Sequence, residues 1–312
     1  MPHGEIVMAV HRPDPELLRR QLESLRAQTV RTWTCRIGID GADAAAESLI
    51  RHLVGDDPRF VVHAYADNVG VYRHVERMLR EVTADAVWVA LSDQDDHWHD
   101  DKVERLLAAL TSGPALATAA TCQAALVDRD GVHLGRTDRR PGDVIDLLLR
   151  NHVTGSLTLW RGDVVAAALP FPGATDASIH DHWLAVCAAG LGEVRLVDEV
   201  LQDYVQHGGN LLGEVGRTTF RSELRAARNR GGLRAHLDHA ARHRWQWRVA
   251  MASGLVDRGI DQDPVVADIA AGRVSGRLLR RAGRSVVQGR LRLRGAVGVL
   301  VAATWSRGAA RP

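Results

Sequence analysis

Residues 86–98, AVWVALSDQDDHW, join an apolar run to a cluster of carboxylates. The run up to Ser92 is typical of a buried strand, and Asp93, Asp95 and Asp96 follow it within four positions. Carboxylates this close repel one another unless a cation neutralises them, and Mg²⁺ or Mn²⁺ prefers such oxygen ligands. The stretch therefore predicts a strand that ends at a divalent-metal site. The alternative is that Asp95, Asp96 or Asp100 caps the helix that follows, because Asp is favoured at helix starts.

Strands and helices alternate around this stretch. On its N-terminal side, sequence patterns predict strands at residues 5–10, 35–40 and 60–65, a helix that starts at Asp14-Pro15, and helices at 44–54 and 71–82. On its C-terminal side we expect helices at 101–110 and from His180, strands at 116–127, 155–160 and 194–197, and a turn at Asp130-Gly131. Such alternation is typical of a Rossmann-like α/β fold with a mixed, mainly parallel sheet.

A change of charge predicts a domain boundary near residue 214. Residues 1–214 contain 20 Lys+Arg and 32 Asp+Glu, whereas residues 215–312 contain 20 and 6. We therefore expect one domain over residues 1–214 and a basic, Arg-rich helical extension over 215–312 with breaks at Gly231-Gly232 and Asp263-Pro264. A basic extension favours an anionic partner.

The cysteines and the ends of the chain indicate a cytoplasmic protein. Cys35, Cys122 and Cys187 lie far apart within apolar runs, so we expect buried free thiols rather than disulfides. Residues 1–10 lack the pattern of a signal peptide. The longest apolar run of the extension, residues 296–304, is about half of the roughly 20 residues that cross a bilayer, so no membrane span is expected.

The carboxylate cluster and several later motifs resemble those of one enzyme family. Residues 92–102 resemble the S-D-Q-D-D-x-W-x-x-D-K motif of family 2 glycosyltransferases, especially their rhamnosyltransferase-like branch. Further matches follow in the family's order at Ile39-Asp40-Gly41, Asn68-Val69-Gly70-Val71, Asn151-His152-Val153-Thr154-Gly155, His180-Asp181-His182-Trp183 and Gln206-His207-Gly208-Gly209-Asn210. The resemblance spans residues 4–214 and implies the A-type glycosyltransferase fold, with the catalytic domain at 1–214, a nucleotide-sugar half before residue 112 and an acceptor half after it.

The resemblance also implies a role for individual residues. Asp181 matches the catalytic base, and Asp95 and His207 match metal-contacting positions. The nucleotide sugar would be bound by Val10, His11, Arg12, Asp40, Asn68, Gly70, Arg73, Asp93 and Gln94, with Asp40 at the base or ribose and Arg73 near the diphosphate. The acceptor side would include Trp98, Thr154, Gly155, His180, His182 and Trp183. The family usually has Tyr-Asn at the position of His11-Arg12, so the nucleotide base stays open.

These residues together predict an inverting, metal-dependent glycosyltransferase that serves cell-wall or polysaccharide synthesis. A divalent Mn²⁺ or Mg²⁺ ion would neutralise the leaving diphosphate, and one carboxylate would take the proton of an acceptor hydroxyl. The donor would be a nucleotide-diphosphate sugar, with deoxythymidine-diphosphate rhamnose as first choice, and the acceptor a saccharide, a lipid-linked glycan or another small molecule. Two alternatives are a degenerate, nucleotide-sugar-binding scaffold protein and a sugar nucleotidyltransferase, although residues 10–16 lack the glycine-rich loop expected of the latter.

The arginine-rich end of the extension has two interpretations of equal weight. Arginines alternate with leucine and valine over residues 277–294, a pattern that suits peripheral contact with an anionic membrane. Alternatively, these helices pack on the acidic part of the chain or on a second copy, as in a homodimer. No recognised nucleic-acid-binding motif accompanies the arginines, so we expect no nucleic-acid partner.

Overall fold

The computed structural model describes residues 3–113, 117–175, 178–206, 232–240 and 244–309. The chain forms two compact units. The first unit consists of the described residues within Met1–Pro141, His152–Phe171 and Ile179–Gly208. The second unit consists of those within Gly142–Asn151, Pro172–Ser178 and Gly209–Pro312.

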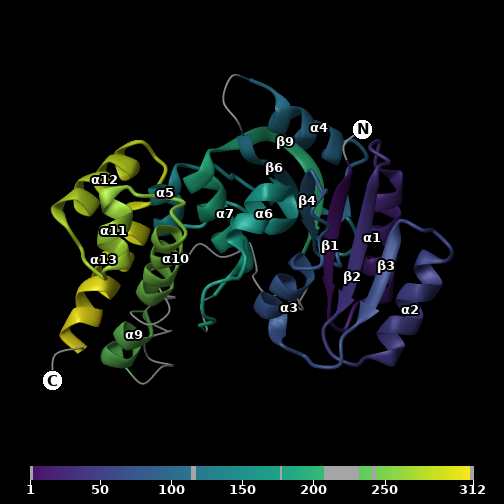
Figure 1. Cartoon of the computed structure of the whole chain (residues 1–312), viewed down its shortest axis with the longest axis horizontal. Coiled ribbons are helices and arrows are strands. Elements are labelled where there is room, and N and C mark those ends of the chain that lie inside the picture. Colours follow the sequence, from purple (N-terminus) through teal and green to yellow (C-terminus); the bar gives the residue numbers. More distant parts are fainter. Residues whose placement is uncertain (1–2, 114–116, 176–177, 207–231, 241–243, 310–312) are drawn as a thin grey trace. The chain divides into compact units, whose positions relative to one another are not determined.

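A single sheet lies at the centre of the first unit (Figure 1). Its strands are β1 Gly4–Val10, β2 Trp33–Ile39, β3 Phe60–Ala64, β4 Trp88–Ser92, β5 His97–Trp98, β6 Ala117–Val127, β7 His133–Arg136, β8 Thr158–Arg161 and β9 Glu193–Val205. They are ordered β3-β2-β1-β4-β8-β6-β9-β5, with β7 paired to β6. Strands β3, β2, β1 and β4 are parallel, so their carboxyl ends meet at one edge of the sheet.

Helices cover both faces of this sheet because each has an apolar side. Helices α1 Pro15–Ala27, α2 Ala44–Val54 and α4 Lys102–Thr111 bury their leucine, isoleucine and valine residues against the main core cluster. Helices α3 Gly70–Leu79, α6 Gly162–Ala168 and α7 His180–Leu191 pack on the other face. There Gly38 of β2 permits close approach, because an added Cβ would lie 2.5 Å from Met78 Sδ of α3.

The second unit is helical. It contains α5 Val144–Leu149, α9 Leu233–Ala240, α10 Gln246–Asp257, α11 Pro264–Ala270, α12 Gly276–Val287 and α13 Leu293–Ala309. The short helix α5 contacts α10 and α12, and Arg248 of α10 donates to the Leu149 carbonyl at 2.7 Å. Asp263 and Pro264, predicted to break a helix, begin α11, where the Asp263 side chain caps Val265 N–H. No helix within the described residues is long and apolar enough to span a bilayer.

The predicted fold class is confirmed, with differences of detail. Asp14 caps α1 as expected, accepting from Glu16 and Leu17 N–H. The three cysteines are buried and free, also as expected. Strand β9 is much longer than the predicted residues 194–197, because its charged residues lie on partly exposed positions and mask the apolar pattern. A 3-10 turn at Gly155–Leu157 precedes β8, which therefore starts later than predicted, and α5, α6 and β7 are additional elements.

Candidate active site

Polar side chains at the ends of four parallel strands are joined by hydrogen bonds. The backbone N–H of His11, after β1, donates to Gln94 Oε1 at 3.0 Å, and Gln94 Nε2 donates back to the His11 backbone carbonyl at 3.2 Å. Asn68, after β3, contacts His11 Nδ1 at 3.3 Å and donates to the carbonyl of Asp40, after β2, at 3.1 Å. The structure thus brings together the predicted nucleotide-side residues His11, Asp40, Asn68 and Gln94.

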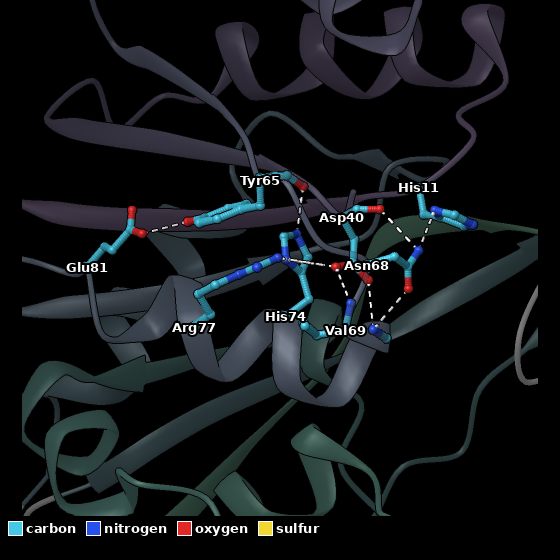
Figure 2. Close-up of polar contacts among 10 residues, drawn as sticks. His11, Asp40, Tyr65, Asn68, Val69, His74, Arg77 and Glu81 are labelled. Atoms are coloured by element: carbon cyan, nitrogen blue, oxygen red, sulfur yellow. Dashed lines mark hydrogen bonds and ion pairs between the residues drawn. The ribbon is translucent and has the colours of Figure 1, made fainter. Parts of the chain in front are cut away.

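Asp40 organises the start of helix α3. Its two carboxylate oxygens accept from Val69 N–H at 3.0 Å and Gly70 N–H at 2.9 Å (Figure 2). Gly70 has a φ of +76°, which glycine adopts without strain and other residues adopt at a cost. Because Asp40 is only 6% exposed, its main contribution in this structure is to hold the loop that follows β3.

Arg77 of α3 joins Asp40 to a cluster of aromatic side chains (Figure 2). Its Nη2 lies 3.2 Å from Asp40 Oδ1 and 2.6 Å from His74 Nδ1, and its guanidinium stacks 3.6 Å from the centre of the Tyr65 ring. A guanidinium only donates and the Gly38 carbonyl, 2.8 Å from His74 Nε2, only accepts. His74 is therefore the neutral tautomer protonated on Nε2, consistent with burial that lowers its pKa.

The carboxylates predicted to bind metal lie in the loop between β4 and β5. Surrounding protein atoms and the negative charge of Asp95 raise the pKa of Asp93 to about 6, and Asp181 adds to this shift. The Asp93 side chain nevertheless reaches solvent. Repulsion between neighbouring carboxylates is the part of the shift that a bound cation would remove. Asp93, Asp95 and Asp181 are therefore close enough to interact.

Asp96 and Lys102 form a buried polar layer beside this loop. Asp96 accepts from Gln202 Nε2 and from Val205 N–H, and burial raises its pKa well above the usual range. Lys102 Nζ donates to the Ser156 carbonyl and to Gln202 Oε1, both at 2.5 Å, and burial lowers its pKa to about 7. Asp96 thus holds β9 rather than capping a helix, which the sequence left open.

Buried polar residues on α1 and at its C-cap, Gln28, also fix the carboxylate loop. Gln21 Nε2 donates to Ser92 Oγ at 2.9 Å, and Ser24 Oγ accepts from the backbone N–H of Trp98 at 3.1 Å. Gln28 Nε2 donates to the His99 carbonyl at 2.8 Å. Sequence reasoning missed these residues, although their spacing of three and four places polar groups on the apolar side of the helix and could have revealed them.

Asp181 lies in the first turn of α7 and faces the turn before β8. Its Oδ2 accepts from Gly155 N–H at 3.2 Å. A Cβ added to Gly155 would lie 3.3 Å from Asp181 Cβ and 3.1 Å from Leu91 Cδ1, so glycine permits this approach. A carboxylate at a helix N-terminus is also stabilised by the helix dipole. The structure therefore joins three predicted residues, Gly155, His180 and Asp181, at the edge of the carboxylate cluster.

The remaining predicted residues have varied surroundings. Arg73 forms an ion pair with the buried Glu76 on α3. Arg12 has a backbone φ of +46°, the only positive φ among non-glycine residues within the described ranges. Val10 is a core residue, and the partly buried Thr154 accepts from Thr158 Oγ1 through its carbonyl. Trp98, His182 and Trp183, which were predicted to contact an acceptor, are buried in this structure. His207 lies outside the described residues.

The carboxylate loop suits a divalent ion that shares its ligands with a substrate. Within the described ranges, no three His, Cys, Asp or Glu side chains converge as a self-contained metal site. Mg²⁺ and Mn²⁺ are commonly held by one or two carboxylates together with substrate phosphates. The chemistry and mutual repulsion of Asp93 and Asp95 fit that kind of ligand set.

A sheet with polar residues beyond the carboxyl ends of its parallel strands belongs to the class of α/β proteins that bind ligands at this edge. Residues 5–158 match the family model described as glycosyl transferase family 2. The chain therefore contains a glycosyltransferase family 2 domain, as the motif around Asp93 and Asp95 predicted. The match does not separate branches of the family, so the rhamnosyltransferase-like branch stays a prediction. No curated protein matches the chain significantly.

Solved glycosyltransferase structures share the fold. The chain is similar to mannosyltransferase PcManGT from Pyrobaculum calidifontis in complex with GDP-Man and Mn²⁺, with 14% identity, a TM-score of 0.51 and coverage of 99% of this chain and 88% of that one. It is also similar to S. aureus TarS 1–349 in complex with UDP-GlcNAc, with 10% identity, a TM-score of 0.57 and coverage of 98% and 92%. At these identities the likeness concerns the fold alone, and it confirms the A-type fold.

Proposed function

We propose that the chain transfers a sugar, with inversion, from a nucleotide-diphosphate donor to an acceptor hydroxyl. The observation that carries the proposal is the grouping of Asp93, Asp95 and Asp181. Two of these carboxylates come from the loop after β4 and the third from the first turn of α7, yet they lie close enough for their charges to interact. One pair can hold the diphosphate end of a donor, and the third can act on the acceptor.

The loops after β1 to β4 would bind the nucleotide part. His11, Asn68 and Gln94 cross-link these loops, and exposed Val69 and half-exposed Arg73 lie at the start of α3. Asp40 uses both carboxylate oxygens to hold the backbone of this loop. We therefore assign Asp40 to shaping the nucleotide site through the loop that its carboxylate holds.

Asp93 and Asp95 would hold a divalent ion on the donor diphosphate. When bound, such an ion neutralises negative charge that grows on the leaving diphosphate. The carboxylates also place the donor against the loop that Gln21, Ser24 and Gln28 keep rigid. PcManGT, whose structure contains GDP-Man and Mn²⁺, supports Mn²⁺ or Mg²⁺ as the ion.

Asp181 would take the proton from the acceptor hydroxyl. Gly155 N–H donates to Oδ2 of Asp181 and so orients this carboxylate, which as a general base would accept the hydroxyl proton. A single base opposite the leaving diphosphate gives in-line attack and inversion at the anomeric carbon. Thr154, Gly155 and His180 are the residues that we assign to the acceptor side.

A panel of donors tests the proposal. The full chain would be incubated with Mn²⁺ or Mg²⁺, a set of saccharide and lipid-linked acceptors, and deoxythymidine-diphosphate rhamnose, GDP-mannose or UDP-GlcNAc. Mass spectrometry should detect a glycosylated acceptor or, without an acceptor, slow release of nucleoside diphosphate. Donor binding without transfer or hydrolysis would indicate a nucleotide-sugar-binding scaffold protein rather than a transferase. Formation of a nucleotide sugar from a nucleoside triphosphate would instead identify a nucleotidyltransferase.

A further inference from the structure

The last part of the chain is basic throughout. Residues 269–312 contain ten arginines and no aspartate or glutamate. Several of these arginines form ion pairs with carboxylates of the second unit. Arg277 lies 3.2 Å from Asp268, Arg290 lies 3.2 Å from the fully buried Asp146, and Arg281 pairs with Asp143. These pairs account for part of the charge and agree with the packing interpretation for these particular residues.

Four other arginines of the same region are differently placed. They are exposed and have no carboxylate partner among the residues that the structure describes: Arg280, Arg284, Arg292 and Arg294. Arg280 and Arg284 are one turn apart on α12, and Arg292 and Arg294 flank the start of α13. Their charge is therefore available to an anionic partner.

Large apolar side chains are exposed on the same two helices. Leu293, Val297 and Val301 are spaced by four residues and therefore form one stripe along α13. Leu293 is 65% exposed, although Ala296, Val299 and Ala302 on the opposite side of the helix are buried. On α12, Leu279 is exposed and Val287 is 88% exposed. Helices α12 and α13 contact each other, so these residues belong to neighbouring elements.

We propose that this α12–α13 face, made of the five exposed apolar residues and the four arginines without carboxylate partners, binds an anionic lipid surface. Leucine and valine beside arginine suit a membrane interface, where apolar groups enter the acyl boundary and cations meet lipid phosphates. A second copy fits the face less well, because a twofold interface would bring the same arginines of both copies together. Nucleic acid would use the arginines but not the valine stripe.

The expected strength is that of a reversible contact. An arginine near an anionic leaflet strengthens partition into the membrane by roughly fivefold, so four arginines contribute up to a few hundredfold. This electrostatic part falls as salt shortens the Debye length from about 10 Å at 0.1 M to a few ångströms near 1 M. The apolar stripe adds a part that salt does not weaken.

Sedimentation of the full chain with vesicles tests the proposal without any measurement of activity. The protein should sediment with vesicles of equal parts phosphatidylglycerol and phosphatidylcholine at about 0.05 M salt, and should be released near 0.5 M. It should not sediment with phosphatidylcholine alone. Replacing the four arginines of the face by glutamine should weaken binding by roughly a hundredfold or more. Replacing Leu293, Val297 and Val301 by serine should weaken it as well.

A charge-matched control separates a specific face from general basicity. Four exposed arginines of the first unit, each paired with a nearby carboxylate, would be replaced by glutamine: Arg19, Arg51, Arg105 and Arg140. This variant should lose less than about fivefold in vesicle binding. The proposal is overturned if the full chain ignores the anionic vesicles, or if the control and the α12–α13 variant lose binding equally. It is also overturned if sedimentation equilibrium shows a dimer that the serine variant dissociates, or if the serine variant binds vesicles like the unchanged chain.

Discussion

Replacing Arg77 by methionine should destabilise the first unit by about 2–4 kcal/mol. The change removes a charge-assisted hydrogen bond to Asp40 at 3.2 Å, for which about 1.5–3 kcal/mol is typical. It also removes stacking on Tyr65 at 3.6 Å, for which about 0.5–2 kcal/mol is typical. The Arg77 side chain is 26% exposed, so the lower parts of these ranges apply. Asp40 keeps Val69 and Gly70 N–H as partners and is not left unpaired.

Urea unfolding followed by tryptophan fluorescence measures this change. The midpoint should fall while the slope with urea stays constant, because the exposed surface on unfolding is unchanged. Arg51→Met is the matched control. Arg51 is 58% exposed and pairs with Glu47 one turn away, so its loss should cost about 0.5 kcal/mol or less. A double-mutant cycle with Tyr65→Leu should give a coupling of about 0.5–2 kcal/mol. If Arg77→Met matches the control and shows no coupling to Tyr65, the reasoning about this cluster is refuted.

Two further predictions concern packing and pH. Gly38→Ala should cost about 1–3 kcal/mol, because its Cβ would lie 2.5 Å from Met78 Sδ. Gly173→Ala should be neutral, because its Cβ would meet no atom of the described residues within 4 Å. Equal unfolding midpoints for the two variants would contradict this. In the second unit, hydrogen bonds from Ser275 and Arg273 lower the pKa of Asp268 from 3.8 to about 2. The stabilisation is therefore present above about pH 4 and is lost as the pH falls toward 2. Amide protection factors in α11 and α12, which are corrected for the pH dependence of intrinsic exchange, should fall over that window in the unchanged chain and change less in Asp268→Asn. Identical pH profiles of the protection factors would show that Asp268 does not contribute.

Local signals predicted most of the first unit. Asp14-Pro15 carries its own cap and first-turn proline, and the apolar run before Asp93 could only be a buried strand or a short buried helix segment. The carboxylates after β4 stand out because they directly follow that run. His11, Asp40, Asn68 and Gln94 each follow a predicted strand. In a parallel sheet these strand ends lie at one edge, so the grouping of the four residues could be expected.

Long-range partners could not be predicted. Lys102 is buried because Gln202, 100 residues later, and the Ser156 carbonyl accept its hydrogen bonds. Arg77 contacts Asp40, 37 residues earlier, because α3 packs against β2. The short helix α5 lies in the middle of the sequence but packs with α10 and α12, which are more than 90 residues further on. No local pattern encodes such pairings, since they depend on which surfaces meet after folding.

The role of Asp181 is the central claim, and one pair of variants tests it most directly. Donor affinity in Mn²⁺ would be measured by calorimetric titration, and transfer by product formation, for Asp181→Asn and Asp95→Asn. Asp181→Asn should bind donor like the unchanged chain but transfer about 10²- to 10⁴-fold more slowly, because it lacks only the base. Asp95→Asn should instead lose metal-supported donor binding. Near-normal transfer by Asp181→Asn, with donor binding intact, would contradict the account and place the base elsewhere.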